Sequence, residues 1–339
     1  MRILVTGGAG YLGSVLSATL LDNGHHVRVL DNLMQGGRSL LSLIGHPRFQ
    51  MVAGDVRHRD IVGSALEDVD AVVHLAAIVG DPACARDPEL AVAVNTEASA
   101  DLIAAAGRAR VGRFVFASTC SNYGRMRDTS VAATEDHELR PLSLYAETKV
   151  ATEQRLLAAA DTGMCGTVLR FATLYGLSPR MRFDLTVNQF AKEAIVDRAL
   201  TVFGEQFWRP YVHVRDAALA IATVLAAPAD AVSGQVFNVG HSEENYRKQD
   251  LVQLLRSHVP DLEVRQVHVA DDPRDYRVSF DRIQARLGFV PKMRVPAGLA
   301  ELVFAIESGI FERLDDPYYS NTGERPAHTA GVKEGACAQ

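Results

Sequence analysis

The chain has 339 residues and a formal net charge of −6, a length that suits one large domain or two closely joined domains. Acidic and basic residues are interspersed, so the sequence offers no basic face for nucleic acid and no polybasic anchor for a membrane. The apolar run nearest to membrane-spanning length, Ala217 to Ala227, is too short, and the first strand begins at Arg2, which leaves no room for a signal peptide. We therefore expect a cytoplasmic protein.

The cysteines lie far apart in the sequence, at Cys84, Cys120, Cys165 and Cys337. Their separations match neither the paired spacing of metal ligands nor a disulfide framework. The sequence therefore predicts no metal site, and it predicts thiols that stay reduced in the cytoplasm.

The chain opens with an apolar run, Ile3–Thr6, that leads into a glycine-rich turn and then into a helical pattern. Strand, glycine turn and helix together let backbone N–H groups and a helix N-terminus face a pyrophosphate. Glycine is needed because a Cβ would block the turn or the approach of the phosphate. A second strand, His26–Leu30, ends at Asp31, at about the separation where an acid binds the adenosine ribose. A solvated loop acid is the competing interpretation of Asp31.

Short apolar strands alternate with helical patterns up to about residue 170. The expected strands are Ile3–Thr6, Val27–Leu30, Gln50–Ala53, Ala71–Leu75, Phe114–Ala117 and Thr167–Phe171, and the longest expected helices are Glu89–Arg108 and Leu144–Ala160. This alternation predicts an α/β fold, a Rossmann-type doubly wound parallel sheet covered on both faces. Ligands of such sheets bind beyond the carboxyl ends of the strands, where Asp31, Asp55 and Ser118–Thr119 fall.

The pattern changes after about residue 175. A loop at Gly176–Asp184 precedes an expected helix at Leu185–Asp197, a strand pair at Thr201–Phe203 and Tyr211–Val214, a helix at Asp216–Leu225, a strand at Gln235–Val239, a helix at Lys248–His258 and two short helices within Asp281–Gly309. We predict a dinucleotide-binding domain at 1–175, a smaller α/β substrate lobe at 176–317 with some chain crossing between the two, and a disordered tail at 318–339.

Tyr145 and Lys149 are four residues apart at the start of an expected helix, so both side chains lie on one face. A nearby ammonium group favours the phenolate and lowers the pKa of a phenol, which lets it exchange a proton while hydride moves to or from a nicotinamide. Thr119 ends an apolar strand, where its hydroxyl could hold the reacting oxygen. A surface helix pair, and a strand-end hydroxyl that satisfies a turn, are the competing interpretations.

The motifs that follow one another along the chain resemble the extended short-chain dehydrogenase/reductase family, in its nucleotide-sugar epimerase/dehydratase branch. The residues that carry the resemblance are Thr6–Gly13, Asp31–Leu33, Gly54–Val56, His74–Ala77, Asn95, Ser118–Thr119, Tyr123–Gly124, Tyr145–Lys149 and Arg209–Asp216. The match runs from Met1 to about Gly309.

The resemblance implies a bound dinucleotide and names its contacts in this sequence. They are Gly7, Gly10, Tyr11, Leu12 and Gly13 at the pyrophosphate, Asp31 and Asn32 at the ribose, Asp55 and Val56 at the adenine, Leu75, Ala76 and Ala77 along the cofactor, Asn95 in support of the motif backbone, and Tyr145 and Lys149 at the nicotinamide end. The acid at Asp31 favours NAD over NADP, because a carboxylate repels a 2′-phosphate.

The resemblance also implies a nucleotide-sugar substrate and a homodimer that pairs the helix near Glu89–Arg108 with the Tyr145 helix. The catalytic residues would be Tyr145, Lys149 and Thr119, and the substrate contacts would include Thr119, Cys120, Ser121, Thr173, Arg180 and Arg209. Arg209 would contact the diphosphate, which suits a guanidinium. Arg180 and Arg182, with Phe207 and Trp208, would shape the sugar and base pockets, and a place in the core of the lobe is the competing interpretation of Trp208.

The residues after Thr119 separate the possible reactions. The family's 4,6-dehydratases carry an Asp-Glu pair where this chain has Cys120 and Ser121, and its sugar-acid decarboxylases keep a glutamate at the Ser121 position. Neither reaction is favoured here. The family's C3/C5 epimerases use a cysteine at the Ser121 position, so Cys120 is one residue off, and a small buried thiol is the stronger interpretation.

Two reactions at C4 of the sugar stay open: a 4-epimerase that works through a 4-keto intermediate, and an NAD(P)H-dependent reductase of a 4-keto-6-deoxyhexose. Asp31-Asn32-Leu33, typical of tightly held NAD, favours the epimerase. A dinucleotide sensor without catalysis is the alternative of another class, but such proteins commonly lose the tyrosine or the lysine, and both are present. His74 and His213 are expected to be packed core residues.

Overall fold

The computed structural model describes residues 1–126, 128, 130–159, 163–269 and 275–321. Its centre is a seven-stranded sheet in the order β10-β6-β5-β4-β1-β2-β3. The strands are β1 (Arg2–Thr6), β2 (His26–Asp31), β3 (Phe49–Ala53), β4 (Ala71–His74), β5 (Arg113–Thr119), β6 (Cys165–Phe171) and β10 (Gln235–Val239). Every pairing is parallel. The strand order reverses at β1 and β4, so the predicted doubly wound Rossmann-type fold is confirmed.

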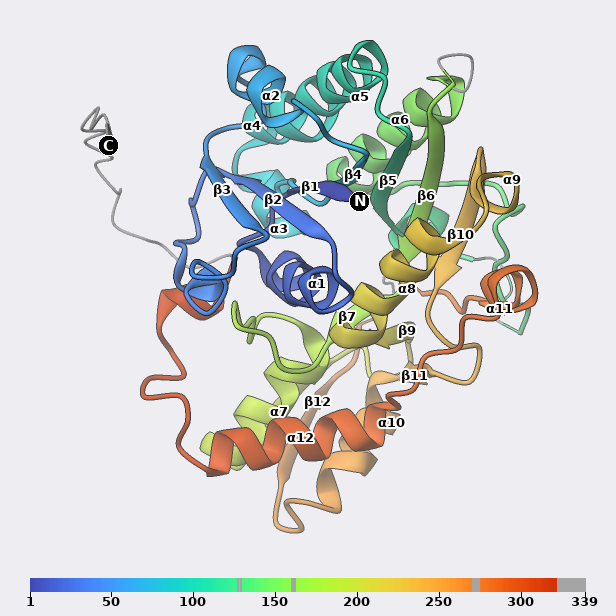
Figure 1. Ribbon diagram of the computed structural model, residues 1–339. Helices are drawn as coiled ribbons and strands as arrows, with labels where there is room; N and C mark the ends of the chain where they lie inside the picture. Colours follow the sequence, from blue (N-terminus) through green and yellow to red (C-terminus); the bar gives the residue numbers. More distant parts are fainter. Residues whose placement is uncertain (127, 129, 160–162, 270–274, 322–339) are drawn as a thin grey trace.

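Helices cover both faces of this sheet (Figure 1). One face carries α1 (Tyr11–Asp22) and α8 (Val214–Ala226), which pack against each other, and the other carries α2 (Arg59–Ala65), α5 (Ser99–Arg108) and α6 (Leu144–Ala158). Successive side chains of a strand point to opposite faces, so β1 contributes to both cores. Ile3 and Val5 are fully buried on the α1 side and Leu4 on the α6 side. Burial on both faces explains why the strands read as continuous apolar runs.

The segment expected to form one helix at Glu89–Arg108 is helical throughout but not uniformly α-helical. After α3 (Asp81–Arg86), the helix α4 (Pro88–Val92) continues through a π-helical stretch at Ala93–Ala98 into α5. Asp87 caps α4 by accepting a hydrogen bond from the Leu90 amide. The π-helical stretch places Asn95 in the interior, where only 2% of it is exposed. Apolar periodicity predicted the extent of the helix but not this local change of winding.

The part of the chain after β6 also builds two smaller sheets. The further elements of this part of the chain are β7 (Thr173–Tyr175), α7 (Thr186–Val196), β8 (Ala199–Phe203), β9 (Trp208–His213), α9 (Ala229–Val232), β11 (Asn245–Arg247), α10 (Lys248–Arg256), β12 (Glu263–Val267), α11 (Asp281–Leu287) and α12 (Val295–Glu307). β9 pairs with β7 and β11, whereas β8 pairs with β12. Strands therefore form at both expected places, Thr201–Phe203 and Tyr211–Val214, but the expected pairing of one with the other is wrong. The helix α12, with 13 residues, is not short as expected.

The part of the chain after residue 176 contributes to both lobes. β10 extends the seven-stranded sheet by pairing with β6, and α8 packs against α1. Figure 1 shows β7, α7, α10 and α12 below the sheet as a separate layer. A division at residue 175 therefore stays a proposal about where one lobe ends and the other begins.

The predicted disordered tail starts too early. Residues 317–319 form a 3₁₀ turn, and the Tyr319 carbonyl accepts a hydrogen bond of 2.8 Å from the Phe183 amide. The Tyr319 ring packs edge-on against the rings of Phe183 and Phe311. The Asn321 amide donates to Asp184 Oδ2 at 3.1 Å. A polar, small-residue composition pointed to disorder, but the aromatic side chains at its start anchor this segment. Residues 322–339 of that prediction lie outside the described residues.

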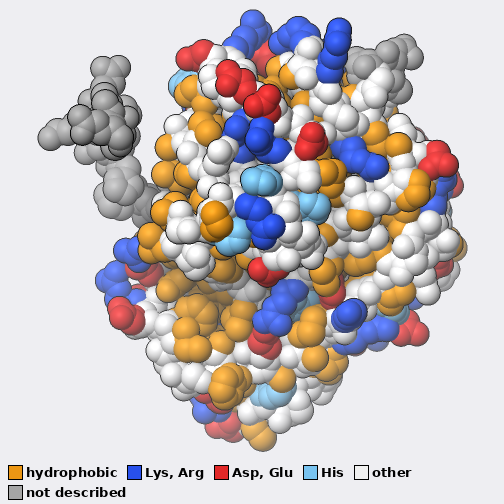
Figure 2. Space-filling view, viewed as in Figure 1, with side chains coloured by type: hydrophobic (Ala, Val, Ile, Leu, Met, Phe, Trp, Pro, Cys, Tyr) orange, Lys and Arg blue, Asp and Glu red, His pale blue; other side chains and the backbone are white. Residues whose placement is uncertain are grey.

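Figure 2 shows positive and negative side chains interspersed over one face of the molecule. Within the described residues, no helix is both long and apolar enough to cross a membrane. The same residues contain no cluster of His, Cys, Asp or Glu that could hold a metal ion. Cys84, Cys120 and Cys165 are free and buried, and Cys337 lies outside the described residues.

Candidate active site

The glycine turn between β1 and α1 is closed so tightly that one position cannot carry a side chain. Gly7 has a φ of +74°, and the Gly10 amide donates to the Gly7 carbonyl at 3.1 Å. A Cβ on Gly13 would lie 2.2 Å from that carbonyl oxygen. Gly10 is the N-cap of α1 and no side chain caps the helix. The first amides of α1 are therefore left for an anionic group, and the residues present fit the pyrophosphate of a dinucleotide.

Asp31 stands at the end of β2, beside this turn. Its carboxylate accepts hydrogen bonds from the amides of Ala9 (2.9 Å) and Leu33 (2.8 Å). These contacts fix the acid next to the glycine turn, while its burial raises the pKa of the carboxyl. The position suits an acceptor for ribose hydroxyls.

A second acid lies beside the first, on the loop after β3. Asn32 donates to Asp55 Oδ2 at 3.2 Å, and Val56 is buried next to them. Hydrogen bonds from the Arg57 side chain lower the pKa of Asp55 to about 2. The structure thus brings together Asp31, Asn32, Asp55 and Val56, the residues expected around the adenosine.

The backbone after β4 is held by Asn95 from the π-helical stretch. The Asn95 side chain accepts from the Ile78 amide at 2.8 Å and donates to the Ile78 carbonyl at 2.9 Å. It also lies 3.3 Å from the hydroxyl of Thr148, on the helix that carries Tyr145. Leu75, Ala76 and Ala77 are half-buried just before Ile78. Asn95 therefore supports the backbone of this segment, in the way the resemblance implies.

Tyr145 and Lys149 lie together on α6, beside the end of β5. The Lys149 ammonium donates to the Ala117 carbonyl at 2.9 Å and lies 4.8 Å from the centre of the Phe116 ring and 5.9 Å from that of Tyr145. Burial lowers the pKa of Lys149 to about 8. The Ser143 side chain caps this helix by accepting a hydrogen bond from the Ala146 amide, so the helix begins at Leu144, directly before Tyr145.

Lys149 is expected to lower the pKa of Tyr145, but the net shift of that pKa in this structure is upward. Burial of the phenol is the largest influence, and it raises the pKa of Tyr145. Among the titratable groups that act on this phenol, Arg182 lowers its pKa, whereas Cys84 and Asp81 raise it. Desolvation therefore outweighs the attraction between the phenolate and nearby cations.

Thr119 is the last residue of β5, and its hydroxyl oxygen accepts a hydrogen bond of 3.1 Å from the Ser121 amide. This contact starts a 3₁₀ turn at Cys120–Tyr123. Ser121 Oγ lies 3.3 Å from the hydroxyl of Tyr276. Thr119 and Ser121 are half-buried and can still reach a ligand.

Cys120 points away from this pair. Only 1% of it is exposed, its thiol donates to the Arg170 carbonyl at 3.3 Å, and burial raises its pKa well above the usual range. Its assignment as a substrate contact is therefore wrong, because a strand end directs neighbouring side chains to opposite sides.

Two arginines that stand two residues apart play different parts. The Arg180 guanidinium is buried and donates to Met181, Gln35 and Asn321, so it holds the C-terminal segment. Its assignment to the substrate pocket is wrong. Arg182 instead forms a half-buried, two-bond pair with Asp184, at 2.8 and 2.9 Å, and its charge acts on Tyr145.

Tyr276 is a site residue that the sequence analysis missed. It is buried, touches Ser121, and its ring lies 5.7 Å below the guanidinium of Arg209, which is itself buried. Tyr276 also influences the pKa of Tyr145. It belongs to an irregular segment without apolar periodicity, so no sequence pattern singles it out.

Thr173 lies half-buried in β7, next to Tyr211 of β9.

Tyr11 joins the two lobes. Its hydroxyl donates to the Gly176 carbonyl at 2.6 Å and accepts from the Asn188 side chain at 3.1 Å. The phenol therefore lies in the lobe contact, and Leu12 is buried in the core. Only the backbone of these two residues stands at the start of α1, next to the glycine turn.

Both histidines are buried in the core, as expected. His74 lies between the Thr6 hydroxyl (2.7 Å) and the Ser99 hydroxyl (2.8 Å), and burial lowers its pKa to about 3. His213 contacts Glu301 at 2.9 Å through Nε2.

Comparison with known proteins places this geometry among nucleotide-sugar enzymes. A model of the NAD dependent epimerase/dehydratase family matches residues 3–240. A dTDP-glucose 4,6-dehydratase of Streptomyces niveus is 33% identical, covering 89% of this chain and 92% of its own. A UDP-glucose 4-epimerase of Corynebacterium glutamicum is 29% identical, covering 92% and 98%. The solved UDP-glucose 4-epimerase of Thermus thermophilus, in complex with NAD, superimposes with a TM-score of 0.80 at 28% identity, covering 91% of this chain and 99% of that one.

Proposed function

This chain belongs to the NAD-dependent epimerase/dehydratase family of extended short-chain dehydrogenase/reductase enzymes, and within it we propose that the protein is an NDP-sugar 4-epimerase. The observation that carries the proposal is the presence of Thr119, Tyr145 and Lys149 around the carboxyl end of β5, together with a glycine turn that fits a pyrophosphate. NAD would be the cofactor, and it would supply an acceptor and then a donor of hydride.

The side chains would divide the work at C4 of the hexose. Thr119, still able to donate its hydroxyl proton, would hold the C4 oxygen against Tyr145. Tyr145 would act in its phenolate form: it would take the proton of that oxygen as the carbonyl forms, becoming the neutral phenol, and return the proton when the opposite face is reduced. Lys149 would keep a positive charge close to the phenol, and Arg182 would add a second. Arg209, stacked on Tyr276, would meet the diphosphate.

The residues next to Thr119 argue against elimination of water, although dehydratases are among the relatives. The dehydratase pattern places two carboxylic acids at positions 120 and 121, where this chain has a buried thiol and a serine. Neither side chain can act as a carboxylic acid in removing the C5 proton or protonating the C6 hydroxyl. Epimerisation needs no such acid pair, since the same tyrosine serves both half-reactions.

The test is to purify the protein and identify the dinucleotide that it retains. Mass spectrometry of the released ligand, followed by NMR of UDP- and dTDP-hexoses incubated without added cofactor, distinguishes the reactions. Retained NAD with inversion at C4 supports the epimerase. Consumption of added NAD(P)H in equal amount with a 4-keto sugar supports the ketoreductase instead, and a 4-keto-6-deoxy product supports the dehydratase.

Tyr145→Phe is the matched variant for this test, because it removes one hydroxyl and leaves the ring in place. We expect it to retain the dinucleotide and to lose turnover by at least about 100-fold. A variant that epimerises as fast as the wild type would remove Tyr145 from the mechanism.

We also propose that the protein is a homodimer, in which α5 and α6 of each protomer meet their counterparts. The two helices pack against each other on one side of the sheet, and α5 is rich in alanine, which permits close approach. Light scattering at micromolar concentration tests this proposal, and a monomer would contradict it.

A further inference from the structure

A buried carboxylate, Glu153, lies one helical turn beyond Lys149 on α6 and has no part in the mechanism above. Only 1% of it is exposed. Tyr145, Lys149 and Glu153 follow one another at intervals of four residues, so they share one face of the helix. A buried acid needs partners, because an isolated carboxylate is costly inside a protein.

The partners of Glu153 flank Thr119. Glu153 Oε1 accepts from the hydroxyl of Ser118 at 2.5 Å and from the side-chain amide of Asn122 at 2.8 Å. Asn122 also donates to Ser118 Oγ at 3.1 Å. Ser118 directly precedes Thr119, and Asn122 lies in the 3₁₀ turn that follows it. Glu153, on the same helix as Tyr145, is therefore hydrogen-bonded to the residue before Thr119 and to a residue of the turn after it.

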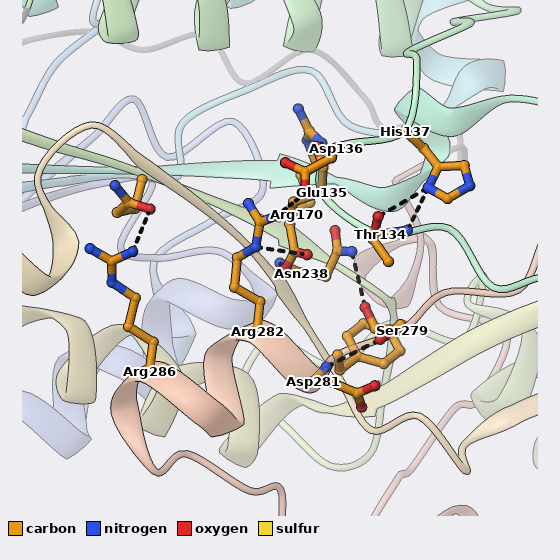
Figure 3. A network of polar contacts seen from close by, with 12 residues as sticks. Thr134, Glu135, Asp136, His137, Arg170, Asn238, Ser279, Asp281, Arg282 and Arg286 are labelled. Carbon is orange, nitrogen blue, oxygen red and sulfur yellow. Dashed lines mark hydrogen bonds and ion pairs between the residues drawn. The ribbon is translucent and has the colours of Figure 1, made fainter.

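Arg170 of β6 neutralises this acid. Its Nη2 donates to Glu153 Oε2 at 2.7 Å, and its Nη1 donates to the Tyr123 hydroxyl at 3.0 Å and to the Glu135 carbonyl at 3.3 Å. The contacts continue beyond Arg170 (Figure 3). The Glu135 carboxylate accepts from the Asn238 backbone amide, and the Asn238 side chain donates to the carbonyl of Ser279, three residues after Tyr276. The network thus connects the turn around Thr119 to the segment that carries Tyr276.

Stability alone is a weak reason for this arrangement. A buried ion pair can often be replaced by apolar side chains of similar size without loss of stability, because desolvation of the charges offsets their attraction. What an apolar pair cannot supply is a fixed acceptor for Ser118 and Asn122. The distinctive contribution of Glu153 is therefore geometric.

We infer that Glu153 is a positioning residue for Thr119: by accepting from Ser118 and Asn122, it fixes the Thr119 hydroxyl at the distance from Tyr145 that the sugar oxygen requires. This inference rests on the proposed function. Displacement of a reacting group by about 1 Å can cost roughly 100-fold in rate, so a loosened turn should reduce kcat while leaving substrate and dinucleotide binding largely intact.

Two double variants separate the ion pair from the hydrogen bonds to the turn. Glu153→Gln with Arg170→Met and Glu153→Leu with Arg170→Met both remove the charges, but only the glutamine keeps an acceptor for Ser118 and Asn122. We expect kcat of the glutamine variant to exceed that of the leucine variant by at least about tenfold, with similar KM and retained dinucleotide. Equal kcat values for two folded variants would overturn the inference.

Ser118→Ala is the third variant, in case the leucine double variant does not fold. It removes the same link from the side of the turn, and we expect kcat to fall about tenfold. Thr167→Val is its control: this buried hydroxyl of β6 donates to the Val232 carbonyl, away from the site. A Ser118→Ala protein that keeps the wild-type kcat would also contradict the inference.

Amide hydrogen exchange provides a readout that needs no turnover. Residues 119–123 should exchange at least about tenfold faster in the leucine than in the glutamine double variant, and in Ser118→Ala than in Thr167→Val. If the wild type turns over no nucleotide sugar, the proposed function fails. The positioning role of Glu153 is judged independently of turnover: equal exchange rates at residues 119–123 in the two double variants would overturn it.

Discussion

The glycine turn allows a prediction in which folding and dinucleotide binding respond to different substitutions. In Gly13→Ala, the new Cβ would lie 2.2 Å from the Gly7 carbonyl oxygen and 2.7 Å from the Gly8 Cα. Both are backbone atoms of a turn held between β1 and α1, so they cannot move aside without displacing the helix. Overpacking of this kind costs about 1–3 kcal/mol, and the rigid neighbours place this case at or above the upper end.

Gly10→Ala differs because its Cβ would meet only the Gly7 carbonyl, at 3.1 Å, and Gly10 has an ordinary φ of −76°. The chain should fold with a change below about 1 kcal/mol, while the methyl group lies where a pyrophosphate would approach. Gly63→Ala is the control. It lies in the interior of α2 with nothing near its Cβ, and it should stabilise the protein by about 0.5–1 kcal/mol.

Urea denaturation gives the free energy of unfolding of each variant, and the amount of dinucleotide per protomer after purification gives the binding. We expect Gly13→Ala to lose both, Gly10→Ala to lose mainly the dinucleotide, and Gly63→Ala to lose neither. Wild-type stability in Gly13→Ala, or full dinucleotide content in Gly10→Ala, would refute the reasoning.

Arg57→Ala should return the pKa of Asp55 from about 2 toward its ordinary value near 3.8, and NMR titration of the carboxyl measures this shift. In the wild type, Asp55 stabilises the folded protein above pH 3.8, and this stabilisation is lost as the pH falls through 2. The pKa of His74 is about 3 in the folded protein and near 6.5 in the unfolded chain, so between these pH values only the unfolded chain binds the proton. The free energy of unfolding should therefore fall as the pH drops from 6.5 toward 3, by up to about 1.4 kcal/mol per pH unit. His74→Gln should flatten this slope in urea titrations at several pH values. Tyr319→Ala should destabilise the protein by about 2 kcal/mol in calorimetry, because its ring packs against Phe183, and an unchanged melting temperature would contradict that packing.

The parts of the molecule that the sequence predicted well are those that depend on local pattern. Apolar runs between glycines and helices predicted the parallel sheet, and the spacing of Tyr145 and Lys149 predicted their shared face. The pairing of β8 with β12 could not be predicted in this way, because strand partners are chosen by tertiary packing rather than by neighbours in the chain.

The site itself was predicted unevenly for the same reason. Arg180 and Arg182 look alike in the sequence, yet one anchors the C-terminal segment, whereas the other pairs with Asp184 and its charge lowers the pKa of Tyr145. Glu153 reads as an ordinary charge on a helix until β6 places Arg170 against it. Tyr276 comes from a segment without periodicity. Residues whose roles depend on contacts between distant elements carry no local signal.

The π-helical stretch at Ala93–Ala98 constrains how this protein can vary in length. A π-helical turn holds one more residue than an α-helical turn, so removing one residue there would restore regular winding, leave the helices on either side nearly in their present orientation, and displace the residues of the stretch itself. Asn95 would then leave Ile78 and Thr148, and the backbone after β4 would lose its support. A single-residue deletion in this stretch should therefore impair the dinucleotide site from a distance, whereas replacements that preserve the residue count should be tolerated.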